Sequence, residues 1–133
     1  MSAPATFAFD FAHPEDYLRA ETGPKDIEWV PVRKAPPGPG ALDGLAARVA
    51  EHGLQPLRAP EPFPFDSTKA VQAALYAKSI GRCVAFSLAA FRQCYAAGRS
   101  LEDVDTILIA AAACEMHPRA VLKALERADK HAP

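Results

Sequence analysis

The distribution of proline constrains the fold of this chain more than any other feature of its sequence. Of thirteen prolines in 133 residues, eleven lie at or before Pro64, and none falls between Pro64 and Pro118. Proline removes a backbone hydrogen-bond donor and breaks the interior of a helix. The first half should therefore form strands, turns and short helices, whereas the second half is free to form long helices.

The first half opens with an alternating apolar pattern that leads into a helix. Phe7, Phe9 and Phe11 alternate with smaller or polar residues, which is the period of a half-buried strand. Pro14 suits the first position of a helix, because its missing N–H would have had no intrahelical partner. His13 is thus predicted at the N-cap, beside unpaired backbone N–H groups and the positive end of the helix dipole.

A second strand is expected soon after this helix. The helix should run from residue 14 to about residue 22, where Gly23-Pro24 stops it, and residues 26–32 are predicted to form the strand. The crossover between the strands is about the dozen residues that a parallel βαβ unit needs. After a linker at 35–40, a helix ending at Gly53 should bury Leu42, Leu45, Ala46 and Val49.

The second half shows helix caps and apolar stripes. Asp66 or Ser67 should cap its first helix, Ser100 with Asp103 resembles a capping box, and Pro118 starts the last helix. The residues expected to be buried are, helix by helix, Ala70, Ala73, Ala74 and Ala77; Val84, Leu88, Phe91 and Tyr95; Val104, Ile107, Leu108 and Ala111; and Val121, Leu122 and Leu125.

Charge, apolar runs and cysteines limit the classes of function. A net charge of −1 gives no electrostatic reason to expect nucleic acid or an anionic membrane as partner. The first six residues lack the pattern of a secretory signal, and the longest apolar run, residues 107–114, is too short to span a bilayer. We therefore expect a cytoplasmic protein. Its three cysteines form no C-x-x-C motif and should be reduced, buried thiols: Cys83, Cys94 and Cys114.

The segment around His13 also resembles a known family. FDFAHPEDYL, from Phe9 to Leu18, looks like the opening of DsbA-like thioredoxin proteins, in particular 2-hydroxychromene-2-carboxylate isomerases and kappa-class glutathione transferases. That branch typically has FDF-x-S-P-Y-x-Y-L here, and disulfide oxidoreductases of the family have C-P-x-C. The resemblance continues through residues 27–32, 45–54, 60–67 and 98–103.

This resemblance implies an α/β fold, in which a thioredoxin-like βαβ unit is followed by an all-helical subdomain as in DsbA. Residues 1–34 would form the βαβ part of the core, 35–64 a proline-rich linker with one helix, and 65–133 the helical subdomain. The family's first helix is longer by about two turns. Its C-terminal ββα unit has no counterpart in the sequence, so we expect a truncated member or a sheet completed by another chain.

The resemblance further implies glutathione-linked isomerase or oxidoreductase chemistry. The family's working group stands just before the motif proline, where this chain has His13, and the second redox cysteine corresponds to Asp16. Without sulfur at either position, dithiol–disulfide exchange through this motif is chemically excluded. A neutral imidazole could orient a thiol or an enol, assisted by Asp10, Glu15 or Asp16. The alternative is that His13 only caps the helix.

The resemblance also suggests how a small thiol or aromatic ligand would be held. Glutathione would be contacted by His13, Pro14, Tyr17, Asp66 and Ser67. The alternatives are packing for Tyr17 and capping for Asp66 and Ser67.

Two further expectations concern metals and partners. No metal site is expected, because the possible ligands have no recognisable spacing: His52, His117, His131 and Cys114. A rival hypothesis is a non-catalytic interaction or dimerisation module, since an incomplete sheet leaves unpaired edge groups that another chain can bind, as in a homodimer.

Overall fold

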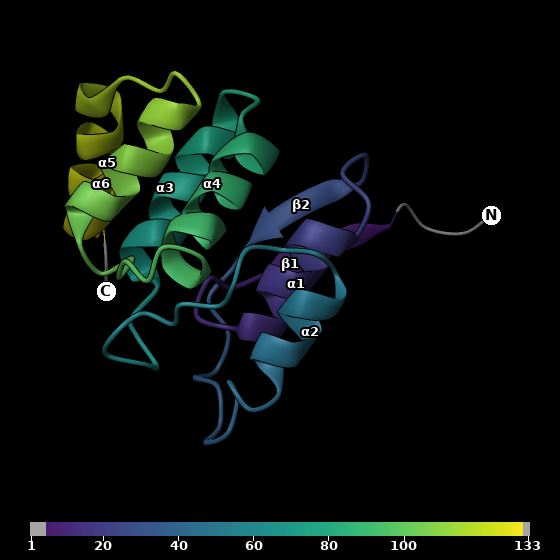
Figure 1. Ribbon diagram of the computed structural model, residues 1–133. Coiled ribbons are helices and arrows are strands. Elements are labelled where there is room, and N and C mark those ends of the chain that lie inside the picture. Colours follow the sequence, from purple (N-terminus) through teal and green to yellow (C-terminus); the bar gives the residue numbers. More distant parts are fainter. Residues whose placement is uncertain (1–4, 132–133) are drawn as a thin grey trace.

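The computed structural model describes residues 5–131, and within that range it contains two strands and six helices. In chain order the elements are β1 (Thr6–Phe9), α1 (Pro14–Thr22), β2 (Glu28–Pro31), α2 (Leu45–Glu51), α3 (Thr68–Ser79), α4 (Cys83–Tyr95), α5 (Val104–Ala113) and α6 (Pro118–His131). Figure 1 shows α3 to α6 gathered into one helical block, with the two strands, α1 and α2 beside it. The proline-free stretch forms α3, α4 and α5, as its composition predicts.

The two strands form the parallel βαβ unit that the crossover length predicts. Phe7 pairs with Trp29 and Phe9 with Pro31, and α1 connects the strands. Side chains alternate along β1, so that the two phenylalanines are buried while Thr6 and Ala8 are exposed. The alternation ends with the strand at Phe9.

Asp10 departs from the expected alternation. The chain leaves β1 after Phe9 and turns towards α1, so Asp10 is not on the exposed face of a strand. Its side chain is only 2% exposed. The predicted strand alternation therefore does not extend to Asp10, whose carboxylate is buried.

Aromatic side chains join the βαβ unit to the helical block. The ring of Phe91 on α4 lies 4.8 Å from Phe11, 5.8 Å from Phe9 and 6.0 Å from Tyr17, measured between centroids. Tyr17 also stacks on Tyr95 at 5.1 Å. These offset and tilted contacts suit the quadrupoles of the rings, and they fix α1 and β1 against α4.

The buried faces of α3 and α4 follow the predicted stripes to different degrees. Every alanine of the expected α3 ridge is fully buried. On α4, Phe91 and Tyr95 are buried, but Val84 and Leu88 are only partly so. The α4 face is centred elsewhere because this helix packs against α1, α3 and α5 at once, and its other buried residues are Phe86, Ser87, Ala90 and Cys94.

The cap of α5 differs from the predicted capping box. Asp103 is the N-cap, and its carboxylate accepts a hydrogen bond from the backbone N–H of Asp105 at 2.9 Å. The Ser100 hydroxyl accepts from the N–H of Glu102 in the preceding turn instead. The helix therefore begins at Val104, with the aspartate doing the capping.

Two positions predicted to be buried are exposed. Leu122 on α6 is 41% exposed, because Val121 and Leu125 face the neighbouring helices and Leu122 lies around the helix from them. Ala46 on α2 is exposed for the same reason, since only Leu45 and Val49 of that helix are buried.

The cysteines are free thiols. Cys94 and Cys114 are buried as expected, whereas Cys83 at the start of α4 is partly exposed. Burial raises the pKa of all three thiols.

Within the described residues no helix has both the length and the apolar character needed to cross a membrane. The expectation about the first six residues lies largely outside the described range.

Candidate active site around His13

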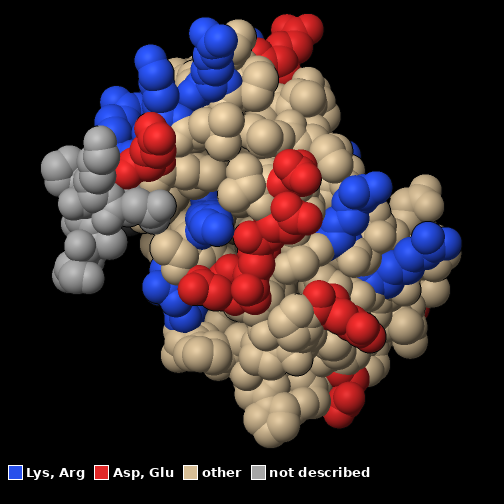
Figure 2. Space-filling view, turned by 90° about the vertical axis from the view of Figure 1, so that its left-hand side faces the viewer, with Lys and Arg blue, Asp and Glu red and all other residues tan. Residues whose placement is uncertain are grey.

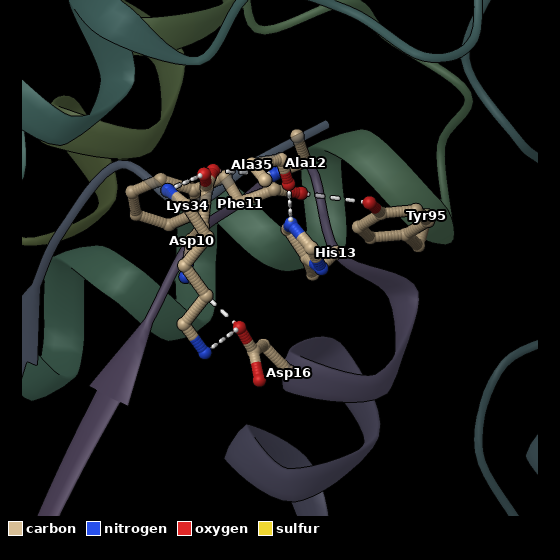
Figure 3. A network of polar contacts seen from close by, with 8 residues as sticks. All are labelled: Asp10, Phe11, Ala12, His13, Asp16, Lys34, Ala35 and Tyr95. Atoms are coloured by element: carbon tan, nitrogen blue, oxygen red, sulfur yellow. Dashed lines mark hydrogen bonds and ion pairs between the residues drawn. The ribbon is translucent and has the colours of Figure 1, made fainter. Parts of the chain in front are cut away.

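His13 and Pro14 form the start of α1 as predicted. His13 is the N-cap, with extended backbone angles (φ −104°, ψ 111°), and Pro14 is the first helical residue. The imidazole makes no capping hydrogen bond. Its Nε2 atom instead lies 2.7 Å from the carbonyl oxygen of Ala35, on the segment that follows β2 (Figure 3). Because a carbonyl only accepts, Nε2 carries a proton in this contact, and in the neutral form of the ring Nδ1 then holds the lone pair.

A second His-Pro pair shows what capping looks like in the same chain. At the start of α6, His117 Nδ1 accepts a hydrogen bond of 3.1 Å from the backbone N–H of Arg119, the second helical residue. The equivalent N–H in α1, that of Glu15, has no acceptor among residues 5–131. The hypothesis that the His13 side chain caps its helix is therefore wrong.

A buried polar network lies under this helix start. The Asp10 carboxylate accepts from the backbone N–H groups of Ala12 (2.9 Å) and Lys34 (2.7 Å). Asp16 Oδ2 accepts from the N–H of Asp10 (3.0 Å) and from Lys34 Nζ (2.9 Å). Both carboxylates are almost fully buried, and Figure 3 shows the network beside the His13 ring.

This network bears on the two predicted catalytic residues. Asp16 binds Lys34 and Asp10, and no hydrogen bond joins it to the His13 ring within the described chain. Its carboxylate thus ties α1 to the segments after both strands. A direct role for Asp16 in proton transfer remains a prediction.

Two tyrosines back the site from α4 and α1. The Tyr95 hydroxyl donates to the carbonyl oxygen of Phe11 at 2.7 Å, and burial holds the pKa of Tyr95 well above its usual value, so it stays a donor. Burial, followed by the nearby Glu21 carboxylate, raises the pKa of Tyr17 to about 12. Tyr17 is 1% exposed and packs on Tyr95, as its alternative interpretation predicted.

The start of α3 supplies the remaining predicted residues. Ser67 is the buried N-cap but makes no side-chain capping bond. The capping bond comes from Asp66 instead, whose Oδ1 accepts from the N–H of Thr68 at 2.9 Å. The hydrogen bonds from Thr68 lower the pKa of Asp66. The same oxygen lies 3.6 Å from the Arg33 guanidinium. Asp66 is therefore next to the segment after β2 that also bonds His13.

An open pocket of about 500 Å³ lies along the next stretch of chain. It is lined by residues 37–43 together with Phe63 and Pro64. The stretch begins at Ala35, which is bound by His13, and it ends in α2, where Arg48 makes a two-pronged ion pair with Glu15. That pair lowers the pKa of Glu15. Glu15 is thus engaged with α2 and forms no described bond to His13.

Metal ligands do not gather in the described part of the chain. Among its side chains, no group of three or more histidine, cysteine or carboxylate residues could hold an ion. The side chain of His131, one of the four residues considered from the sequence, lies outside the described residues.

A solved structure has the same fold as this chain. A 2-hydroxychromene-2-carboxylate isomerase, solved in its selenomethionine form, superimposes with a TM-score of 0.65 over 94% of this chain and 75% of that chain. The two chains share a fold. Their sequences are 18% identical. The likeness confirms the predicted fold class, a thioredoxin-like βαβ unit followed by a helical subdomain. No protein-family model matches the sequence, and no curated protein matches it.

Three residues at the site were not predicted as functional: Arg33, Lys34 and Ala35. All three come directly after β2. The carboxyl ends of parallel strands meet at one edge of a sheet, so the residues after β2 had to lie near those after β1. That topological signal was present in the sequence.

Proposed function

We propose that this chain is a glutathione-linked isomerase of the DsbA-like thioredoxin family, in which His13 moves the proton. The fold shared with the isomerase supports membership of this family, and the activity is inferred from the site itself. The observation that carries the proposal is the His13 hydrogen bond to Ala35, which occupies Nε2. Nδ1 has no hydrogen-bond partner among residues 5–131, so it can accept a proton from a bound thiol or enol.

The helix start gives this proton transfer an electrostatic reason. An anion formed when Nδ1 takes the proton would lie near the first turn of α1, where the dipole and the free Glu15 N–H favour negative charge. Pro14 fixes the backbone of that turn. No electrons are transferred, which suits isomerisation in a motif without sulfur.

Asp66 and Arg33 extend the proposal to the rest of glutathione. Both side chains are largely exposed and form an ion pair beside the segment that bonds His13. We assign Asp66 to the glutathione ammonium group and Arg33 to one of its carboxylates. The predicted contacts Tyr17 and Ser67 are buried and would support the site from behind.

A small-molecule ligand also fits the surface charge. On the face in Figure 2, acidic side chains form a band across the middle with basic side chains on either side of it, so no basic stripe crosses this face. With a net charge of −1, this gives no attraction for a nucleic-acid backbone on that face.

Binding of glutathione tests the proposal. We expect a few millimolar glutathione to raise the melting temperature and to support isomerisation of 2-hydroxychromene-2-carboxylate. S-methylglutathione, which keeps the charges but lacks the S–H, should bind and give no turnover. The proposal fails if glutathione neither shifts the melting temperature nor supports turnover.

A second function, an interaction module, is favoured by the open edge of β1. The N–H of Val32 donates to the carbonyl of Phe9, so the backbone groups of Phe9 and Phe7 face β2. Those of Thr6 and Ala8 must face away. Within the described chain they have no hydrogen-bond partner.

The outer edge of β2 is closed by comparison. Pro31 has no N–H, and the carbonyl of Trp29 accepts from Lys78 Nζ at 2.8 Å. An added strand, such as β1 of a second copy, is therefore proposed to pair with β1.

Oligomeric state tests this second function. Light scattering would show a dimer, and Ala8→Pro, which removes an outward N–H, would give a folded monomer. A monomeric wild-type protein at high concentration would exclude it.

A further inference from the structure

We propose that Asp10 is the positioning residue of the His13 site and that it holds the imidazole in its Nε2–H tautomer. The inference rests on the proposed function only for the role given to His13. Apart from that role, it concerns only how the buried Asp10 carboxylate positions the Ala35 carbonyl that bonds the ring.

The Asp10 carboxylate joins two backbone segments. One carboxylate oxygen accepts from the N–H of Ala12, immediately before His13, and the other accepts from the N–H of Lys34, immediately before Ala35. The residue that bears the ring and the residue that bears its acceptor are thus each one peptide away from an Asp10 hydrogen bond. Asp10 therefore sets the separation between the His13 ring and the Ala35 carbonyl.

Two further bonds hold Asp10 in place. Its own N–H donates to Asp16 Oδ2, and its carbonyl accepts from the N–H of His13 at 3.0 Å. Asp16 is fixed in turn by Lys34 Nζ. Since the Asp10 side chain is 2% exposed, water does not compete strongly for its oxygens.

The fixed tautomer decides which ligand groups the site accepts. With Nε2–H given to Ala35, the neutral form of the ring presents only the lone pair of Nδ1. The ligand atom that meets it must therefore bring a proton, as a thiol or an enol does, and a ligand that arrives as a thiolate gains no hydrogen bond there. We thus infer that the thiol form of glutathione, or an enolic substrate, is the species bound at His13.

Substitution by asparagine keeps the size of the side chain, and an exposed Asp→Asn change elsewhere controls for the lost charge. In Asp10→Asn one acceptor oxygen becomes an NH₂ group, which cannot accept the N–H of Ala12 or Lys34. We expect amide hydrogen exchange at one of these two residues to speed up about tenfold or more. Nitrogen-15 NMR of the His13 ring should show a single Nε2–H tautomer in the wild type and a mixture in Asp10→Asn. The matched control is Asp26→Asn, an exposed carboxylate before β2, which should leave both readouts unchanged.

The outcomes are distinct. A mixed tautomer in the wild type, or a folded Asp10→Asn with a single tautomer, overturns the inference. If Asp10→Asn does not fold, Asp10→Glu is measured in the same way, because its longer side chain cannot keep both bonds in place, and a retained single tautomer again overturns it. Neither readout uses glutathione, so failure of the proposed function would leave this result standing.

Discussion

The starts of α1 and α6 have the same two residues, histidine followed by proline, but use the histidine in opposite ways. His117 turns Nδ1 onto its own helix and caps the N–H of Arg119. His13 turns Nε2 away from its helix and onto Ala35, which is 22 residues distant in sequence. His117 is an exposed residue, whereas the His13 ring lies against a buried network.

The difference shows that a dipeptide predicts a helix start but not the function of the residue at that start. What distinguishes His13 is the neighbouring chain after β2, which supplies an acceptor for the ring. Among the described hydrogen bonds no such segment supplies an acceptor for His117, and its ring instead accepts from the Arg119 N–H of its own helix. The following predictions test what sets the start of α1 apart from that of α6.

Removing each imidazole should separate catalysis from capping. We expect His13→Asn to lower glutathione-dependent isomerisation by about 100-fold or more, which is the usual scale of general acid–base catalysis, while the fold persists because asparagine caps well. His117→Asn should leave the rate unchanged. Equal rates in the two variants would remove His13 from the mechanism.

The network beneath α1 should matter more to stability than the histidine cap of α6. We expect Asp16→Asn to lower the free energy of unfolding by about 2 kcal/mol, because a neutral amide weakens both the ion pair with Lys34 and the hydrogen bond from the Asp10 N–H. Urea denaturation would measure this, with Asp26→Asn as the exposed control at about 0.5 kcal/mol or less. A loss no larger than the control's would show that the network does not stabilise the start of α1.

A tyrosine hydroxyl donates to the chain just before α1, and no described hydrogen bond of this kind lies at the start of α6. Tyr95→Phe deletes the hydrogen bond to the Phe11 carbonyl and keeps the ring packing. A cost of about 1–2 kcal/mol is expected, since a buried carbonyl loses its donor. Thermal unfolding gives the value, and an unchanged melting temperature would contradict this account.

The cap at α6 should give the smallest effect. His117→Ala should cost about 1 kcal/mol, typical of a lost N-cap, and His117→Asn should restore most of it. Chemical denaturation of the two variants is the measurement. If alanine and asparagine are equally stable at position 117, the Nδ1 contact contributes nothing.

Local sequence signals predicted most of the fold. Pro14 and Pro118 mark the first residues of α1 and α6, and the alanine ridge of α3 is buried as expected. Leu122 and Val84 were misplaced because a stripe read from one helix does not show how many neighbours that helix packs against. On α4 the packing of several neighbours centres the buried face away from the predicted stripe, whereas α3 buries its predicted ridge although it also has several neighbours.

The candidate site was predicted only in part, for a related reason. His13 was found because its position depends on adjacent residues. Its acceptor on Ala35, and the pairing of Lys34 with Asp16, depend on contacts 22 and 18 residues apart. Such contacts follow from topology, and no local motif encodes them.

Two contacts hold the chain between β2 and α2 to the start of α1. His13 bonds Ala35 at one end, and Glu15 pairs with Arg48 of α2 at the other. These two contacts differ in kind. The outer one joins two exposed, charged side chains and weakens as salt is added, while the inner one is a hydrogen bond to a backbone carbonyl. Rising ionic strength would therefore weaken the contact at the α2 end of this pocket wall and leave the His13 contact at the other end in place.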